Sequence, residues 1–270
     1  MQEGKSHSKL NQSTKRVKLL TLARDLRRRK ARERHNLFVA EGVRAVDELL
    51  RSALTVRGLL VSPQLAAASR VALSEAAARR AIPLLDVSER DFASAADTES
   101  PQGVLAVGEA PTRSLADVIL PNAARLLVLD AVQDPGNAGT LLRTAAALGV
   151  DATVATPGTV DLWNAKVVRS SMGSLFHHPS LSCTWEELAT FLARGRVPLW
   201  AADASGDPVD ALEARPERLA LVVGNEGAGL STEARARAAR LVGLRIAPHV
   251  ESLNVAVAAG ILLYALRPPP

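Results

Sequence analysis

Asn137 and Arg143 are the first residues of this sequence whose types and spacing could do chemistry. They lie in "LLVLDAVQDPGNAGTLLRTAAALG", residues 126–149, which predicts an apolar strand, a polar turn and a helix. An amide orients a polar group through hydrogen bonds, and a guanidinium binds phosphate or carboxylate through two parallel hydrogen bonds. The pair therefore predicts a site for a charged or polar substrate.

Two more polar loops follow apolar segments later in the chain. "GNEGAG" carries Glu226, and "APHVESLN" carries Ser252 and Asn254. Ligands of parallel sheets bind beyond the carboxyl ends of the strands, so we expect the three loops to form one site, although each alone could be an ordinary turn. Five glycines in these loops should let the backbone approach a ligand or adopt positive φ: Gly136, Gly139, Gly224, Gly227 and Gly229.

The elements that must position these residues form two α/β units. Residues 1–15 are expected to be a flexible basic tail, and residues 16–110 a small α/β domain with helices covering a sheet. The stretch 111–122 contains two prolines and is predicted to be a linker. Residues 123–270 are predicted to form a parallel sheet with helices on both sides, because their strands read as apolar on both faces.

Four helices are predicted with particular consequences. One covers Val17–Arg34, another runs through "LWNAKVVRSSMG", and a third begins at Thr184, with Glu187 completing a capping box. The last, in "SLNVAVAAGILLYAL", is apolar nearly all round, so it must be covered on more than one face. A subunit interface is one way to cover it.

Positive charge is concentrated at the start of the chain. Residues 1–36 hold twelve basic and three acidic residues, a net of +9, so the remainder carries about −4 of the total of +5. Such a block is typical of a surface that binds a polyanion, although it could be a solvated helix. The candidates for contact with such a polyanion are Arg27, Arg28, Arg29, Lys30, Arg32 and Arg34.

Several classes of protein lose support. No apolar run is long enough to span a membrane, no signal-peptide pattern opens the chain, and Cys183 is the single cysteine, which favours a reducing cytoplasm. His177 and His178 are adjacent and no ligand set stands at metal spacing, so we expect no metal. The dinucleotide fingerprint, the P-loop and the hydrolase elbow are all missing, which argues against a nicotinamide oxidoreductase among others.

The three loops resemble the motifs of the SpoU/TrmH family of RNA ribose 2′-O-methyltransferases. In order, they are the turn and helix with Asn137 and Arg143, "GNEGAGL" at Gly224–Leu230, and "VESLNVAVA" at Val250–Ala258; the resemblance covers about Leu126–Leu266. The front unit is similar, around "KARERHNLFVAEGVRAVDELL", to the ribosomal-protein-like RNA-binding domain found in family members that modify ribosomal RNA.

The resemblance implies a cofactor, a topology and an assembly. Family members use S-adenosylmethionine, form a trefoil knot in the C-terminal domain and act as homodimers. Motif register then implies that Gly224, Leu244 and Leu253 line the cofactor pocket. One departure is visible: this chain has Leu244, Arg245 and Ile246 where the family often has Ile-Pro-Met, which puts the usual loop geometry in question.

The resemblance also implies roles in methyl transfer to a ribose 2′-hydroxyl. Arg143 is expected to be the catalytic arginine. A guanidinium holds its proton to about pH 12.5, so we expect Arg143 to clamp the adjacent phosphate and to help position or activate the hydroxyl. Glu226 is expected to orient Arg143 or the ribose, or else to bind a loop amide. Asn137 and Asn254 are expected to hold substrate and loop. Ser252 is expected to form a hydrogen bond within the site while capping the last helix, or else only to cap that helix.

These expectations describe a cytoplasmic, S-adenosylmethionine-dependent RNA 2′-O-methyltransferase acting on ribosomal RNA, for housekeeping or for protection against a ribosome-directed antibiotic. A transfer RNA substrate is the nearest alternative within the enzyme class. A catalytically silent RNA-binding or assembly factor is the alternative outside it, and such a factor would not need Arg143.

Overall fold

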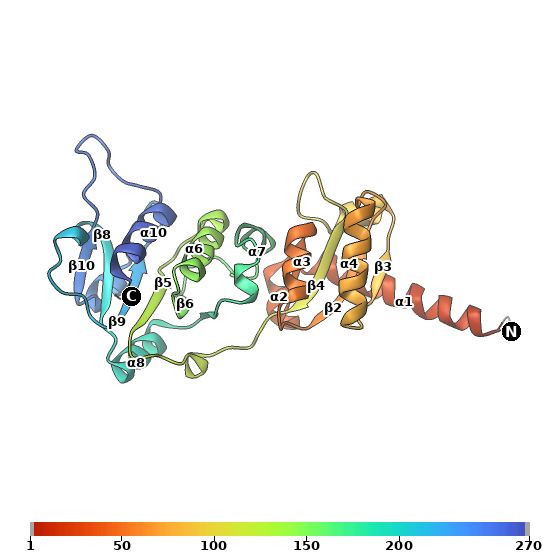
Figure 1. Ribbon diagram of the computed structural model, residues 1–270, viewed down its shortest axis with the longest axis horizontal. Helices are drawn as coiled ribbons and strands as arrows, with labels where there is room; N and C mark the ends of the chain where they lie inside the picture. The colour runs from red at the N-terminus through yellow and green to blue at the C-terminus, as the bar shows by residue number, and fades with distance from the viewer. Residues whose placement is uncertain (1–2, 268–270) are drawn as a thin grey trace. The chain divides into compact units, whose positions relative to one another are not determined.

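The computed structural model describes residues 3–267, and in the first helix it describes side chains from Thr14 onward. The chain forms two compact units (Figure 1), and it first passes from one to the other at Thr112, inside the predicted linker. Met1 and Gln2 of the predicted tail, and the last three residues of the predicted second domain, lie outside the described residues.

The first unit is built on a mixed sheet with the strand order β1-β4-β2-β3. Its strands are β1 (Leu37–Glu41), β2 (Val56–Val61), β3 (Leu84–Asp86) and β4 (Val104–Glu109). β1 and β2 pair antiparallel with β4, and β3 pairs parallel with β2. The helices from the front of the chain are α1 (Glu3–Asp25), α2 (Arg29–His35), α3 (Val43–Arg51), α4 (Ala67–Arg79) and α5 (Glu89–Ala95).

The long helix predicted over Val17–Arg34 is wrong in its extent. α1 begins at Glu3, inside the predicted tail, and ends at Asp25, before a turn and α2. The buried side chain of Leu26 anchors this turn in the hydrophobic core of the unit. Arg32 donates hydrogen bonds to the carbonyl oxygens of Leu26 and Arg27, at 2.8 and 2.9 Å, and so satisfies carbonyls that a continuous helix would have paired.

A segment from the middle of the chain completes the first unit. Trp163–His177 clusters with it rather than with the second unit, and contains α7 (Ala165–Ser170) and the 3₁₀ turn η2 (Ser174–Phe176). The ring of Phe38 in β1 lies 4.5 Å from that of Trp163 and 5.7 Å from that of Phe176. By its contacts this segment belongs to the first unit, although the sequence predicted it within residues 123–270, because its aromatic side chains complete the first core.

The second unit is a parallel sheet with the strand order β10-β8-β9-β5-β6-β7, which confirms the predicted sheet type. Its strands are β5 (Ala124–Leu129), β6 (Ala152–Ala155), β7 (Ser180–Ser182), β8 (Leu199–Pro208), β9 (Arg218–Val223) and β10 (Arg240–Gly243). Its helices are α6 (Pro135–Ala147), α8 (Trp185–Gly195), α9 (Thr232–Arg237) and α10 (Val255–Leu266), with the 3₁₀ turns η1 (Leu115–Asp117) and η3 (Val209–Ala211).

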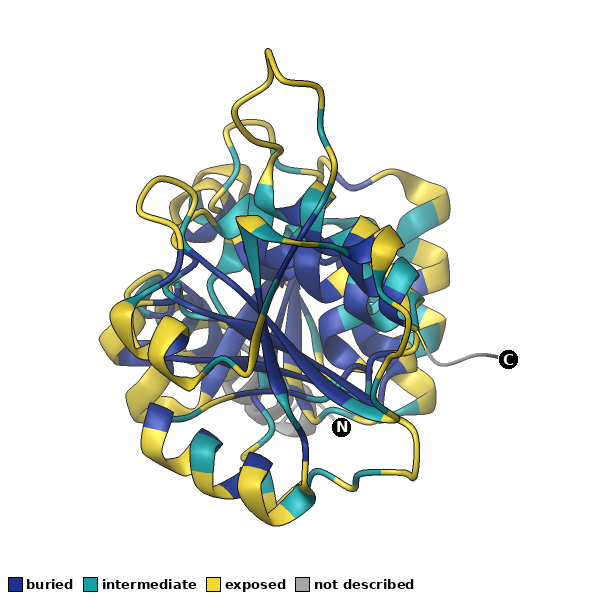
Figure 2. Ribbon diagram, turned by 90° about the vertical axis from the view of Figure 1, so that its left-hand side faces the viewer, coloured by how far each residue is buried: buried dark blue, intermediate teal, exposed yellow. Residues whose placement is uncertain are grey.

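Helices cover both faces of this sheet because its strands are apolar on both sides. Every residue of β5 is buried, and Leu126 and Val128 pack with α8 and α9 on one face. On the other face α6 and α10 pack against each other and the sheet. α8 begins with the predicted capping box of Thr184 and Glu187. Figure 2 shows the buried strands inside a shell of half-exposed helices.

Candidate active site

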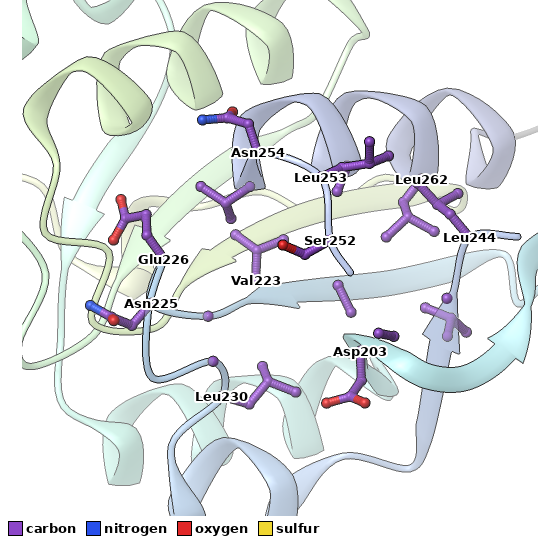
Figure 3. A pocket seen from close by; sticks show the side chains of 18 of the residues that line it. Asp203, Val223, Asn225, Glu226, Leu230, Leu244, Ser252, Leu253, Asn254 and Leu262 are labelled. Carbon is purple, nitrogen blue, oxygen red and sulfur yellow. The ribbon is translucent and has the colours of Figure 1, made fainter. Parts of the chain in front are cut away.

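The second and third polar loops meet at a cavity of about 550 Å³ beyond the carboxyl ends of β9 and β10. Gly224, Leu244 and Leu253, which were expected to line a cofactor pocket, all lie on its wall. Figure 3 shows Leu244 and Leu262 on one side of the cavity and Glu226 on the other. A wall that combines leucines with loop backbone and a few polar groups suits a ligand with both apolar and hydrogen-bonding parts.

Three predicted side chains form one chain of hydrogen bonds at the rim of this cavity. The amide nitrogen of Asn254 donates to the amide oxygen of Asn137 at 2.9 Å, and the amide nitrogen of Asn137 donates to the Glu226 carboxylate at 3.0 Å. Glu226 also accepts from the backbone N–H groups of Gln133 and Asp134, both at 3.2 Å. All three polar loops are thus joined directly.

The environment of Glu226 keeps it ionised. Partial burial by itself would raise the pKa of this carboxyl, but the hydrogen bonds from Asn137, from the Gln133 and Asp134 N–H groups and from its own backbone outweigh burial and lower the pKa. A carboxylate with a lowered pKa is a weak base. Glu226 therefore suits a positioning role better than proton transfer.

Asn137 owes its place to the start of α6. Asp134 caps this helix by accepting from the Asn137 N–H at 2.7 Å, and Pro135 occupies the first turn, where its missing N–H costs nothing. Gly136 and Gly139 consequently lie inside the helix and do not have positive φ, so that part of the prediction for these two glycines was wrong.

The loop after β9 needs glycine at Gly224 because of close backbone packing. A Cβ there would lie 2.4 Å from the carbonyl carbon and oxygen of Gly229, which itself has a φ of +71°. Sequence reasoning did not single out Asn225, yet its side-chain oxygen accepts from the N–H groups of Gly227 and Ala228, both at 2.9 Å. An Asn before a glycine-rich turn is a recognisable signal for such bonding.

Ser252 does not cap the last helix. α10 begins at Val255, and Asn254 is its N-cap, with a side-chain oxygen that accepts from the N–H groups of Ala256 and Val257 at 2.9 and 3.3 Å. Ser252 is exposed two residues earlier and lines the cavity. The prediction failed because Asn254 can reach the first turn of the helix while its amide nitrogen binds Asn137.

Arg143 lies on the exposed side of α6, six residues after Asn137. Among the described residues its guanidinium has no hydrogen-bond or ion-pair partner, and Glu226 does not hold it. In this structure Glu226 does not orient Arg143 but accepts from loop N–H groups, and its expected role toward the ribose stays a prediction. An unpaired exposed guanidinium remains available to an external anion.

A second carboxylate on the cavity wall went unnoticed in the sequence. Asp203 follows the start of β8 and accepts from the Ser205 N–H at 2.9 Å, while its other oxygen lies 2.5 Å from Arg235 in α9. Burial opposes ionisation of Asp203, but these bonds lower its pKa. No motif marks this residue, because the bulge in β8 that exposes it appears only in the pairing with β10.

Arg245, the departure from the family pattern, lies outside the cavity wall. Its guanidinium is 3.5 Å from the Asp210 carboxylate in η3, and both side chains are about two-thirds exposed. The neighbouring residues Leu244 and Ile246 still line the cavity. The substitution is thus accommodated by turning its charge to solvent.

The basic residues at the start of the chain divide into two groups. Arg32 is 6% exposed and binds backbone carbonyls, so it serves the fold and is not a surface contact. The others are exposed around the α1–α2 turn: Arg27, Arg28, Arg29, Lys30 and Arg34. Among the side chains described from Thr14 onward, no cluster of three or more His, Cys, Asp or Glu could hold a metal ion. No helix in the described part of the chain is long and apolar enough to cross a membrane.

Comparison with known proteins agrees with this geometry. Residues 124–264 match the SpoU rRNA Methylase family, and residues 15–106 match the MRM3-like substrate binding domain. The 23S rRNA (guanosine(2553)-2′-O)-methyltransferase RlmP of Bacillus subtilis is 37% identical over 243 residues, which cover 90% of this chain and 93% of the relative.

Two solved structures with bound AdoMet, S-adenosylmethionine, share the fold. The rRNA methyltransferase of Sinorhizobium meliloti superposes with a TM-score of 0.80 and 28% identity, and covers 92% of this chain and 93% of that one. The SpoU methyltransferase AviRb of Streptomyces viridochromogenes also gives 0.80 and 28%, with 92% and 96% coverage. The sequence match, the fold and the joined motif loops lead to one conclusion: this chain belongs to the SpoU rRNA Methylase family.

Proposed function

We propose that this protein transfers a methyl group from S-adenosylmethionine to a ribose 2′-hydroxyl of ribosomal RNA. The observation that carries the proposal is the hydrogen-bond chain Asn254–Asn137–Glu226 at the rim of the cavity, in a chain of the SpoU family. It places the three polar loops around one pocket, with Arg143 exposed on the adjoining helix. The relative in Bacillus subtilis, named for 2′-O-methylation of 23S rRNA, supports this substrate class.

The cavity fits S-adenosylmethionine by size and by lining. Its volume of about 550 Å³ falls within the range of roughly 300–1,000 Å³ typical of small-molecule sites. Leu244, Leu253 and Leu262 offer apolar surface, and the tight packing at Gly224 brings loop backbone to the wall. We propose that these residues hold the cofactor, which would supply an electrophilic methyl group.

The roles of the polar residues follow from their contacts. A ribose hydroxyl is a weak nucleophile that must be oriented and relieved of its proton. We assign Arg143 to the phosphate next to that ribose, since a guanidinium binds phosphate through two hydrogen bonds and this one has no partner among the described residues. Asn137, Asn254 and Glu226 fix the loops that surround the hydroxyl. Ser252, exposed at the cavity, is assigned a hydrogen bond to the substrate.

RNA binding is assigned to the first unit. Its match to a substrate binding domain and the exposed basic residues at the α1–α2 turn support this assignment. Domain limits near residues 16–110 and 123–270, and a cytoplasmic location, remain our proposals. The returning segment Trp163–His177 belongs with the RNA-binding unit.

Two finer features concern the last helix. α10 buries one face against α6 but leaves Val257, Ile261 and Tyr264 between 46% and 57% exposed on another. Spacings of four and three residues put them on one stripe, and we propose that this stripe pairs two copies of the chain. We also propose a trefoil knot, because the chain leaves edge strand β10 and returns to α6, the helix that follows a central strand.

Transfer of a labelled methyl group from S-adenosylmethionine to unmodified ribosomal RNA tests the activity. A 2′-O-methyl group removes the nucleophile of alkaline cleavage, so the label should survive hydrolysis in dinucleotides and disappear with Arg143→Ala. Label in mononucleotides would instead indicate base methylation. Methyl transfer to transfer RNA but not to ribosomal RNA would show that transfer RNA is the substrate. If the protein neither binds the cofactor nor transfers a methyl group, it would be a catalytically silent RNA-binding factor.

A further inference from the structure

A second cavity, of about 340 Å³, lies entirely within the first unit. It opens where β1 ends and α3 begins, and its wall includes Glu41, Arg44, Thr98, Ser100, Arg169 and Met172. Arg169 and Met172 come from the returning segment, inside the part of the sequence that matches the SpoU family. The substrate binding domain as matched by residues 15–106 therefore does not contain the whole wall.

The floor of this cavity is held in place by Glu41. This carboxylate is 5% exposed and accepts from the Asp97 N–H at 2.7 Å and from the Thr98 hydroxyl. On the other side, the Gln102 side-chain oxygen accepts from the Val43 N–H at 2.8 Å. The loop before β4 is thus fixed both to the end of β1 and to the start of α3, so the cavity is formed before any ligand arrives.

The wall from the returning segment is also fixed. Met172 and Gly173 have φ values of +53° and +92°, a tight turn of two left-handed residues. A Cβ on Gly173 would lie 2.6 Å from Cγ of Glu48, so the turn packs directly on α3. This turn positions Met172 beside the cavity, and Arg169 is held by a long ion pair of 3.4 Å to Asp97.

The charge of the lining decides what kind of group fits. Arg44 and Arg169 are balanced by the carboxylates of Glu41 and Asp97, so there is no surplus of positive charge for a phosphate. Hydroxyl, amide and guanidinium groups nevertheless offer both donors and acceptors around the Met172 side chain. An uncharged, flat ligand with donors and acceptors on its edges matches this lining, and a nucleobase is such a ligand.

We propose that this cavity takes one unpaired base of the RNA substrate, with the guanidinium groups of Arg169 and Arg44 packed against its faces and the polar groups of Thr98 and Ser100 on its edge. Proteins that read RNA sequence do so on splayed-out bases, which stack on aromatic rings or guanidinium planes. Arg169 would then be a specificity-determining residue supplied by the methyltransferase part of the sequence. This inference rests on the proposed function only in taking RNA as the ligand.

The test uses the full-length protein and a short fragment of unmodified 23S ribosomal RNA, prepared as a series with one abasic nucleotide at a time. At one position, loss of the base should weaken binding by the wild-type protein about tenfold or more, the usual effect of one stacked base. Arg169→Ala and Arg44→Ala should bind the intact fragment as weakly as the wild type binds the fragment that lacks this base. For these two variants, removal of the same base should cause no further loss of affinity. Arg169→Lys keeps the charge without the plane and should behave like Arg169→Ala.

Arg51→Ala is the matched control, because Arg51 lies at the far end of α3 and pairs with Asp47 on the surface. It should retain the full penalty at the sensitive position. The inference is overturned if each abasic position lowers RNA affinity by the same factor in the wild type and in the cavity variants. It is also overturned if the cavity variants lose affinity equally for all the RNA fragments and show a shallower salt dependence, which would indicate a phosphate contact.

Methyl transfer, measured on the same samples, separates the two proposals. If one base and the cavity arginines depend on each other for binding but the wild type transfers no methyl group, the proposed function is refuted and the base cavity is supported. If the wild type transfers the methyl group but no base depends on the cavity arginines, the base cavity is refuted and the proposed function is supported. An unchanged unfolding temperature shows that a variant's loss of affinity does not come from loss of folding. If one of the Arg44 and Arg169 variants fails to fold, the other still tests the inference.

Discussion

Asn254 donates a hydrogen bond to Asn137 across 2.9 Å, although 117 residues separate them in the chain. The bond joins the N-cap of α10 to the first turn of α6, and it leaves the amide nitrogen of Asn137 free to bind Glu226 at 3.0 Å. The orientation of the Asn137 amide is therefore set from both sides, because its oxygen cannot face a carboxylate.

Replacing Asn137 by Asp should destabilise the protein by about 1–3 kcal/mol at pH 7, because two carboxylates would then face each other where a donor met an acceptor. Repulsion raises the pKa of the pair in the folded state, so the folded state takes up protons more readily and the deficit should shrink as the pH falls from 7 to 5. Asn137→Ala loses the same bond without adding charge. Unfolding in urea at both pH values measures the stability that each variant loses relative to the wild type. This loss should be smaller at pH 5 than at pH 7 for Asn137→Asp and the same at both for Asn137→Ala; the same pH dependence in both variants would contradict this account.

Arg143→Ala should lower methyl transfer to ribosomal RNA at least about 100-fold, the scale of a misplaced reacting group, while S-adenosylmethionine binding and unfolding temperature stay near those of the wild type. The reason is that Arg143 is exposed and holds nothing within the described part of the chain. Arg194→Ala removes an exposed charge from α8 and serves as the control. Single-turnover kinetics and calorimetric cofactor binding measure the two effects. Loss of cofactor binding in Arg143→Ala would argue against its assigned role.

Gly224→Ala should abolish tight binding of S-adenosylmethionine and cost about 1–3 kcal/mol of stability, since the added Cβ would overlap the Gly229 backbone at 2.4 Å. Gly227→Ala adds the same methyl group in the same loop, where the nearest atom is 3.7 Å away, the side-chain oxygen of Asn225. It should therefore bind the cofactor nearly normally. Titration calorimetry on the two variants compares them, and similar losses in both would show that the loop tolerates no side chain at all.

Protonation of His178 should destabilise the fold in mild acid. Burial, with a contribution from Arg113, lowers the pKa of His178 from 6.5 to about 4, and its Nε2 lies 2.8 Å from the Thr153 hydroxyl. Between about pH 6.5 and pH 4 the unfolded chain binds a proton that the folded chain refuses, so stability falls as the pH falls through this window, by about 3 kcal/mol in total. In His178→Gln, the free energy of unfolding should no longer show this loss between about pH 6.5 and pH 4, as measured by urea unfolding at several pH values. His177→Gln, at an exposed neighbour, should leave it in place.

Ile261→Glu should convert the proposed dimer to a monomer, because it places a charge in the middle of the exposed stripe on α10. Val71→Glu changes a more exposed apolar residue of α4 and should have no effect on assembly. Light scattering at equal protein concentration measures the mass of each. A dimer that survives Ile261→Glu would require another interface.

The local elements of this protein follow from local sequence. The apolar runs from Ala124 and Arg218 are buried strands, and the capping box at Thr184 starts α8, as their residues predict. Polar residues at strand ends predicted a single site, because parallel strands end on one edge. The exposed basic residues around the α1–α2 turn were also recognisable from composition alone.

What only the tertiary structure decided concerns partners far apart in the chain. Burial of Arg32 and the turn at Leu26 depend on the core of the first unit, and the returning segment Trp163–His177 leaves the methyltransferase sequence because its aromatic rings pack on Phe38. The same holds for Glu226, which binds Asn137 instead of Arg143. Periodicity and motif spacing report which face of an element is buried; they do not report which distant hydrogen-bond partner will meet it, because that choice is made when the elements pack.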